Sequence, residues 1–211
     1  SEPVINEETG VEVNEDELKQ NDPLTENYDE LKKINADTVG WLKVNNTSVD
    51  YPVVQADDNE YYLKRSFYKK VNGIGWIFMD YRNNINDMSR NTVIYGHNMR
   101  GSSKLMFTTL QKALKESWYT NKDNQVITFN TLNQNMKWQI FSIYVADPED
   151  NYIQTKFATT NIFLEFANAQ KAKSIYDFGV EITEQDKLLT LSTCAEQGTK
   201  RLVIHAKLIN N

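Results

Sequence analysis

The sequence contains very few cysteines and histidines, the residues that form disulfides and most zinc sites. Its 211 residues include one cysteine, Cys194, and two histidines, His97 and His205. A lone cysteine has no partner for an internal disulfide, which excludes a small scaffold held together by disulfides. One thiol and two imidazoles are also too few for the usual zinc sites, and no EF-hand-like loop occurs, so we expect no metal and no cofactor.

Long apolar runs and an excess of positive charge are missing as well. No stretch approaches the roughly 20 apolar residues of a membrane-spanning helix, and the first residues lack the pattern of a signal peptide. The chain has 23 Lys and Arg against 29 Asp and Glu, a net charge of -6. Because phosphate recognition needs a surplus of basic residues, this balance argues against a general nucleic-acid binder.

The composition that remains is that of a folded domain. Hydrophobic residues make up 40% of the chain and aromatic residues 11%, which is enough for a packed core. The length suits one domain. Residues 1–23 are acidic and poor in large apolar side chains, so we predict a flexible tail or the end of a stalk there and a single domain over residues 24–211.

Strand-like segments dominate that domain. They are rich in β-branched and aromatic residues and are separated by clusters of Asn, Asp, Gly and Ser. Eight such segments, which predict a mainly β barrel or sandwich, span residues 40–44, 49–55, 75–82, 91–98, 124–132, 137–146, 187–194 and 201–209.

Helical periodicity appears in three other places. Residues 24–35 carry apolar side chains at helical spacing, as do residues 104–119 and 161–176. These segments do not alternate regularly with the strands, which argues against a repeating βαβ sheet. We expect one N-terminal helix and further helices at the periphery of the β structure.

The single cysteine ends one predicted strand, and an arginine begins the next. Side chains alternate across a strand, so Thr190, Ser192 and Cys194 share one face. If the two strands pair as a hairpin, Cys194 and Arg201 both lie near its loop end. His97 closes another predicted strand, and a histidine and a cysteine at strand ends are what a Cys-His catalyst needs.

Each of these residues also has an ordinary structural explanation. A free cysteine is often buried and behaves as a small hydrophobic side chain. A histidine or an arginine at the end of a strand is commonly a capping or solvated residue. His205 falls in the middle of a strand and is predicted to be a packing residue. The functional interpretation depends on the combination of Cys194, His97 and Arg201.

The motifs around these residues resemble the class B sortases of Gram-positive bacteria. The strings are "TLSTC" (190–194) with "KR" (200–201) and an apolar strand, "YGHNM" (95–99) and "FMDYRN" (78–83). Further similar strings follow in the family's order from about residue 28 to the end. The resemblance implies an eight-stranded β-barrel with an N-terminal helix and a helix-containing connection, residues 147–186, before the cysteine strand.

The resemblance also implies roles for individual residues. Cys194 would be the nucleophile, His97 the acid and base, and Arg201 the group that holds the substrate carbonyl or its oxyanion. For Asp80 it leaves open whether the residue is structural or influences the histidine. The residues implied to line the peptide groove are Asn59, Leu63, Tyr95, Tyr152, Ile153 and Ser192.

The activity implied is that of a cysteine transpeptidase. Such an enzyme cleaves a sorting motif of the Asn-Pro-x-Thr type, or a Ser-Pro or Pro-Pro variant, after its Thr and forms a thioacyl enzyme. It then passes the surface protein to an amine of the cell wall. The enzyme itself would be held on the outer side of the membrane by an N-terminal anchor absent from this sequence. Two alternatives stay open, a cysteine endopeptidase and a non-catalytic surface-binding domain, although the papain-like string around the cysteine is absent.

Overall fold

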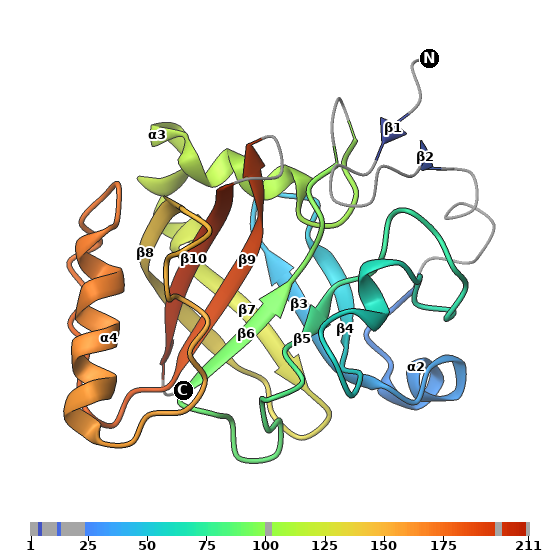
Figure 1. Ribbon diagram of the computed structural model, residues 1–211, viewed down its shortest axis with the longest axis horizontal. Coiled ribbons are helices and arrows are strands. Elements are labelled where there is room, and N and C mark those ends of the chain that lie inside the picture. The colour runs from blue at the N-terminus through green and yellow to red at the C-terminus, as the bar shows by residue number, and fades with distance from the viewer. Residues whose placement is uncertain (1–3, 6–11, 14–23, 100–102, 197–199, 210–211) are drawn as a thin grey trace.

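Eight strands close into a barrel (Figure 1). The computed structural model describes residues 4–5, 12–13, 24–99, 103–196 and 200–209, with the backbone alone at residues 4–5, 12–13 and 194–196. The barrel order is β10-β8-β7-β3-β4-β5-β6-β9. The bounds are β3 Thr38–Val44, β4 Asp50–Val54, β5 Phe78–Met79, β6 Asn91–Tyr95, β7 Val126–Thr131, β8 Lys137–Ala146, β9 Leu188–Glu196 and β10 Lys200–Ile209. The eight predicted strands are confirmed, and they form the barrel rather than the sandwich.

The N-terminal region adds one short pair outside the barrel. β1 (Val4–Ile5) pairs with β2 (Glu12–Val13) in antiparallel fashion. The rest of the predicted tail, residues 1–23, lies outside the described residues.

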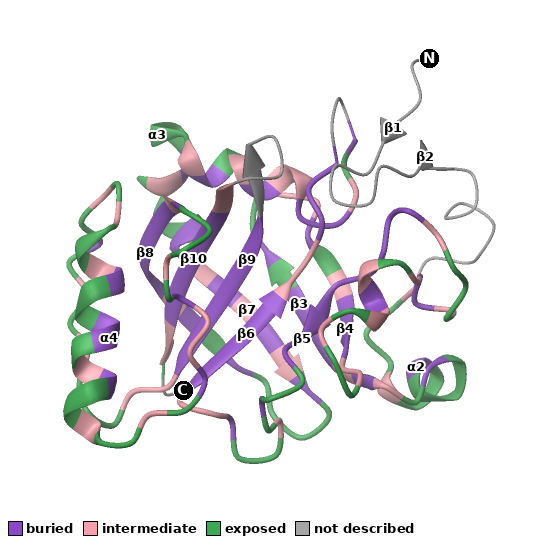
Figure 2. Ribbon diagram, in the orientation of Figure 1, coloured by how far each residue is buried: buried purple, intermediate pink, exposed green. Residues whose placement is uncertain are grey.

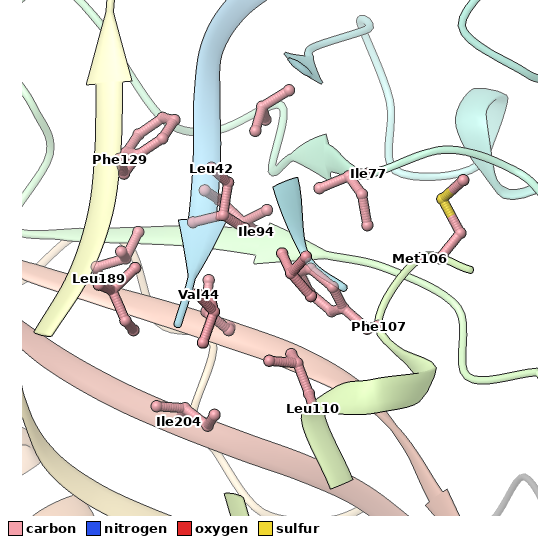
Figure 3. Close-up of a cluster of buried hydrophobic side chains, with 14 of the residues drawn as sticks. Leu42, Val44, Ile77, Ile94, Met106, Phe107, Leu110, Phe129, Leu189 and Ile204 are labelled. Carbon is pink, nitrogen blue, oxygen red and sulfur yellow. The ribbon is translucent and has the colours of Figure 1, made fainter. Parts of the chain in front are cut away.

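The main core fills the barrel interior. Burial alternates along β7, where Ile127 and Phe129 are fully buried and their neighbours are partly exposed. Period-two burial is expected of a strand with one face inward and one toward solvent. Figure 3 shows Phe129 beside Leu42 of β3, and Leu189 of β9 belongs to the same buried cluster.

A second core lies between the barrel and helix α4 (Thr160–Ala172), which runs along the outside near β8 (Figure 1). The buried face of α4 turns toward the strands (Figure 2). Phe163 and Ala167 of the helix pack with Phe141 of β8. This cover explains why β8 is buried nearly continuously rather than at every second residue.

The first and the last of the three predicted helices form where expected. Helix α2 (Tyr28–Ile34) begins at Asn27, whose side chain accepts a hydrogen bond from the Glu30 amide. α4 begins in the same way at Thr159 and ends at Ala172, earlier than the predicted residue 176. None of the helices in the described part of the chain is long and apolar enough to cross a membrane.

The helix predicted over residues 104–119 is wrong as a single element. The chain forms a 3-10 helix, η2 (Thr108–Leu114), and a short helix, α3 (Glu116–Tyr119), separated by an extended Lys115 with ψ of 134°. Leu110, Ala113 and Trp118 are all buried, and the Trp118 indole donates to the Asn45 carbonyl at 3.2 Å. These tertiary contacts override the helical periodicity. Two further 3-10 helices are η1 (Tyr61–Leu63) and η3 (Lys122–Gln125).

The strand predicted over residues 75–82 shrinks to β5. Gly75 has a φ of +65°, which is incompatible with an extended strand. At the other end the Asp80 carboxylate accepts from the Arg82 amide at 2.9 Å, and the Asp80 carbonyl accepts from the Asn83 amide. This turn ends the strand immediately after Met79.

Two pairings of β9 determine what meets at one rim of the barrel. β9 and β10 form an antiparallel hairpin in which Cys194 is the register partner of Arg201. β6 runs parallel to β9, and Tyr95 is the partner of Ser192. The hairpin predicted from the sequence is therefore confirmed.

His205 is a packing residue, as predicted, with its polar atoms satisfied inside the core. The ring is fully buried and stacks on Phe141, while Nδ1 lies 2.8 Å from the Thr190 hydroxyl and Nε2 lies 3.1 Å from the Tyr144 hydroxyl. Burial disfavours the charged ring, with a smaller contribution from Lys173, and lowers the pKa of His205 to about 3.

This lowered pKa predicts a stability that falls in acid. Between the unfolded-state pKa of about 6.5 and the folded-state pKa, the unfolded chain binds the extra proton, so stability is complete above about pH 6.5 and declines below it by up to about 1.4 kcal/mol per pH unit. We expect His205→Gln to be less stable at pH 7.5 but to lose less on going from pH 6.5 to 4.5. Urea unfolding at several pH values measures both slopes, and equal slopes would contradict the assignment.

Candidate active site

A cavity of about 670 Å³ opens at the barrel rim where β6, β9 and β10 meet. All eight of the predicted site residues other than Cys194 line it. The lining comprises Asn59, Leu63, Phe78, Tyr95, Gly96, His97, Pro148, Tyr152, Ile153, Ser192, Thr193 and Arg201. Segments far apart in the sequence thus contribute to one hollow, of the size typical of ligand sites.

The backbone places the cysteine beside this cavity. Cys194 follows the two lining residues Ser192 and Thr193 and faces Arg201 across the hairpin. The Gly96 amide donates to the Ser192 carbonyl at 3.3 Å, so the parallel register of β6 and β9 continues past Tyr95. His97 lies two residues beyond Tyr95 and lines the same cavity.

His97 is held on one side by a backbone carbonyl. The residue is buried, and its Nε2 lies 2.8 Å from the Leu63 oxygen. A carbonyl oxygen only accepts hydrogen bonds, so Nε2 carries a proton and the neutral ring has its basic nitrogen at Nδ1. The His97 carbonyl in turn accepts from the Phe107 amide at 2.9 Å. This arrangement selects the tautomer and the ring orientation.

The cavity wall opposite the strands comes from the connection between β8 and α4. Tyr152 is buried, and its hydroxyl lies 3.1 Å from the Ser192 hydroxyl, which fixes the wall to β9. Leu63, Phe78 and Ile153 give the cavity apolar surface, while His97 and Arg201 supply nitrogen donors. The mixture suits a peptide with both side chains and main-chain carbonyls to bind.

Four lining residues were not predicted from the sequence, namely Phe78, Gly96, Pro148 and Thr193. Thr193 was assigned to the opposite face of its strand by alternation, but at the barrel rim both faces of the strand end reach the cavity. Its hydroxyl is buried and has no hydrogen-bond partner among the described residues. Phe78 belongs to the "FMDYRN" string, which was the available signal.

The sequence left two roles open for Asp80, a structural one and an influence on the histidine. The contacts of Asp80 support the structural role. Its side chain is fully buried, and its carboxylate accepts hydrogen bonds from Arg82, Tyr95 and Asn59. Burial pushes the pKa of Asp80 upward, but these hydrogen bonds together outweigh burial and hold the pKa below its usual value. Asp80 therefore stays ionised at neutral pH.

In the part of the chain that the structure describes, no group of three or more His, Cys, Asp and Glu side chains is arranged to hold a metal ion.

Comparison with known proteins decides the family. Residues 42–209 match the sortase domain family. The chain belongs to the sortase family. It is 36% identical to sortase B of Staphylococcus aureus over 194 residues, which are 90% of this chain and 78% of that protein, and 36% identical to sortase B of Listeria monocytogenes over 185 residues, 85% and 73% of the two chains.

Solved structures agree with this class of sortase. A Staphylococcus aureus sortase B-substrate complex is 37% identical with a TM-score of 0.80 and covers 87% of this chain and 84% of that one. A Clostridium perfringens sortase B is 34% identical with a TM-score of 0.81, covering 87% of this chain and 100% of that one. The barrel is thus a class B sortase barrel, and the protein is a sortase transpeptidase that acts on proteins bearing a sorting motif.

The contact between Gly75 and His97 predicts a defect specific to the site. A Cβ added at Gly75 would lie 2.8 Å from His97 Cδ2 and 2.6 Å from the Tyr62 carbonyl oxygen. We expect Gly75→Ala to displace the imidazole and to lower kcat/KM for peptide cleavage by about 100-fold, the typical cost of misplacing a catalytic group by about 1 Å.

Gly179→Ala is the matched control. Gly179 has nearly the same φ, +66°, but a Cβ there meets nothing within 4 Å. Both variants carry backbone strain of about 1 to 2 kcal/mol, so both should melt earlier. If the two variants lose the same activity, the effect of Gly75 is strain alone and not displacement of His97.

Proposed function

We propose that this sortase cleaves a sorting motif of the Asn-Pro-x-Thr type, or a Ser-Pro or Pro-Pro variant, after its Thr. It holds the acyl part as a thioester on Cys194 and transfers it to an amine of a cell-wall precursor. The observation that carries the proposal is the rim where Cys194 faces Arg201 and His97 lines the same cavity.

In the first half of the reaction the thiol proton of Cys194 passes to Nδ1 of His97, the resulting thiolate attacks the Thr carbonyl carbon, and the carbonyl oxygen gains negative charge. A guanidinium is permanently charged and donates hydrogen bonds in a fixed plane. Arg201 is therefore suited to stabilise this oxyanion, an interaction that strengthens as the charge develops. When the tetrahedral intermediate collapses, the carbon–nitrogen bond breaks and the departing amine takes a proton from His97.

In the second half an amine replaces the departed peptide and attacks the thioester carbonyl. His97 accepts the proton that the attacking nitrogen loses, and the thiolate of Cys194 leaves. The Leu63 carbonyl supports this role because it occupies Nε2 and directs the exchangeable proton to Nδ1. Both halves use the same three residues, and only His97 acts in opposite protonation states: it gives a proton in the first half and accepts one in the second.

The substrate proteins and the location belong to this proposal too. The related Staphylococcus aureus sortase B was solved as a substrate complex, which supports a peptide as the occupant of the cavity. The lining groups that face such a peptide would be Asn59, Leu63, Tyr95, Tyr152, Ile153 and Ser192. Surface proteins that carry the motif are the donors, the peptidoglycan precursor or cross-bridge supplies the amine, and an N-terminal membrane anchor would hold the enzyme outside the cell.

The decisive experiment is a peptide panel read by mass spectrometry. We expect the wild-type chain to release a fragment ending in Thr, and to form a ligated product when triglycine is added. Cys194→Ala should do neither. Release of the fragment without ligation to any amine tested would identify a cysteine endopeptidase instead, and cleavage that survives Cys194→Ala would remove the cysteine from the mechanism.

The role of Arg201 gives a separate prediction. Arg201→Lys keeps the charge but loses the planar donor pair, so we expect kcat to fall by about 100- to 1,000-fold, the usual cost of losing an oxyanion donor. Arg90→Lys is the control, because Arg90 holds the Glu184 carbonyl and does not line the cavity. Equal kcat values in the two variants would contradict the proposed role.

A further inference from the structure

The wall of the cavity that faces the strands lacks regular structure of its own. Residues 151–157 form neither helix nor strand, although Tyr152 and Ile153 line the cavity. A segment without a backbone ladder needs other partners for its carbonyl groups. Groups from other parts of the protein must therefore hold this wall in place.

Side chains from elsewhere in the barrel bind the wall through its main-chain carbonyls. Arg82 donates from Nη2 to the Ile153 oxygen at 3.0 Å, and Asn91 donates to the Gln154 oxygen at 2.9 Å. Gln170 of α4 reaches the Asn151 oxygen at 3.4 Å. Of these three donors, Arg82 bears a charge and is itself held by a buried carboxylate.

That carboxylate belongs to Asp80. Arg82 Nε lies 2.8 Å from Asp80 Oδ1, and Arg82 Nη2 lies 2.7 Å from Asp80 Oδ2. This fork geometry matches both oxygens and leaves Nη2 a second proton for the Ile153 carbonyl. The hydrogen bonds that Arg82 donates to Asp80 raise the pKa of Arg82 above its usual range, so the pair stays charged.

The same carboxylate also binds two other residues that line the cavity. The Tyr95 hydroxyl donates to Asp80 Oδ2 at 2.8 Å, and Asn59 Nδ2 donates to the same oxygen at 3.0 Å. Asn59 Oδ1 meanwhile accepts from the Tyr81 amide at 3.0 Å. The hydroxyl proton of Tyr95 is thereby used within the protein, so Tyr95 offers a bound peptide its ring, and Asn59 offers one remaining N–H.

We propose that Asp80 and Arg82 are a positioning pair that holds three separate parts of the peptide groove, at Asn59, Tyr95 and Ile153, in one fixed arrangement. The inference rests on the proposed function and adds to it a determinant of substrate affinity that does not contact the substrate. A groove shaped before the peptide arrives spares the ordering cost on binding. Breaking the pair therefore weakens peptide binding more than it slows the chemistry at Cys194.

The test compares two ion pairs of similar construction. Arg82→Gln removes the charge and the fork. Lys207→Gln is the matched control, since Lys207 also binds a carboxylate, Asp186, and a backbone carbonyl, that of Glu181. Lys207 is the register partner of Leu188, six residues before Cys194 on β9, or about 20 Å along the strand.

We expect Arg82→Gln to raise KM for the sorting peptide by about tenfold or more while kcat falls less than about threefold, the pattern of lost binding rather than lost chemistry. Lys207→Gln should leave KM and kcat within about twofold of the wild-type values, even if its melting temperature falls as far as that of Arg82→Gln. Arg82→Lys keeps the charge and one or two hydrogen bonds, so its KM should lie between those of the wild type and Arg82→Gln. A KM for Arg82→Gln within twofold of wild type would overturn the proposal.

Hydrogen exchange separates this inference from the proposed function. Amides of residues 151–155 should exchange faster in Arg82→Gln than in the wild type or in Lys207→Gln, whatever the peptide. If the wild type cleaves no peptide, the proposed function fails and exchange alone decides whether the pair positions the wall. Unchanged exchange in folded Arg82→Gln would refute the pair's role even in an active enzyme. If Arg82→Gln does not fold, Arg82→Lys carries both measurements.

Discussion

The parallel pairing of β6 with β9 is the constraint on which the rest of the structure depends. It closes the barrel and runs His97 and Cys194 toward the same rim. The antiparallel hairpin of β9 and β10 then brings Arg201 back to that rim. Cys194 and Arg201 are paired within the β9–β10 ladder, and His97 follows two residues after the end of β6, where its ring is held by the Leu63 carbonyl. A site assembled from ladder ends is positioned as accurately as the barrel itself.

The parts of this arrangement that rest on local pattern are predictable from the sequence. Alternating and β-branched segments locate all eight strands, and the position of Cys194 and Arg201 at a hairpin end follows from two adjacent strands and a short loop. The burial of His205 follows from its place inside an apolar strand. The closure of the barrel, and with it the approach of His97, does not follow from local pattern, and only the resemblance to the sortases indicated it.

Tertiary contacts account for what the sequence did not predict. The segment 104–119 has a helical stripe, but burying Leu110 and Trp118 together breaks it at Lys115. Strand β5 is short because Gly75 and the Asp80 turn limit it on both sides. Arg82 is a local partner of Asp80, two residues along the chain, but the partners at positions 59 and 95 reach Asp80 only in the closed barrel. No spacing rule connects positions 59, 80 and 95.

The way residues 151–154 are anchored has a consequence for the evolution of such an enzyme. The donors from Arg82, Asn91 and Gln170 bind carbonyl oxygens, which every amino acid has. Replacing the Ile153 side chain, which lines the cavity, therefore leaves these main-chain anchors intact. Tyr152 is the exception, because its side chain is buried and bonds Ser192. Ile153 can thus change with little effect on how the barrel holds the wall. Substrate preference in this fold can drift separately from catalysis.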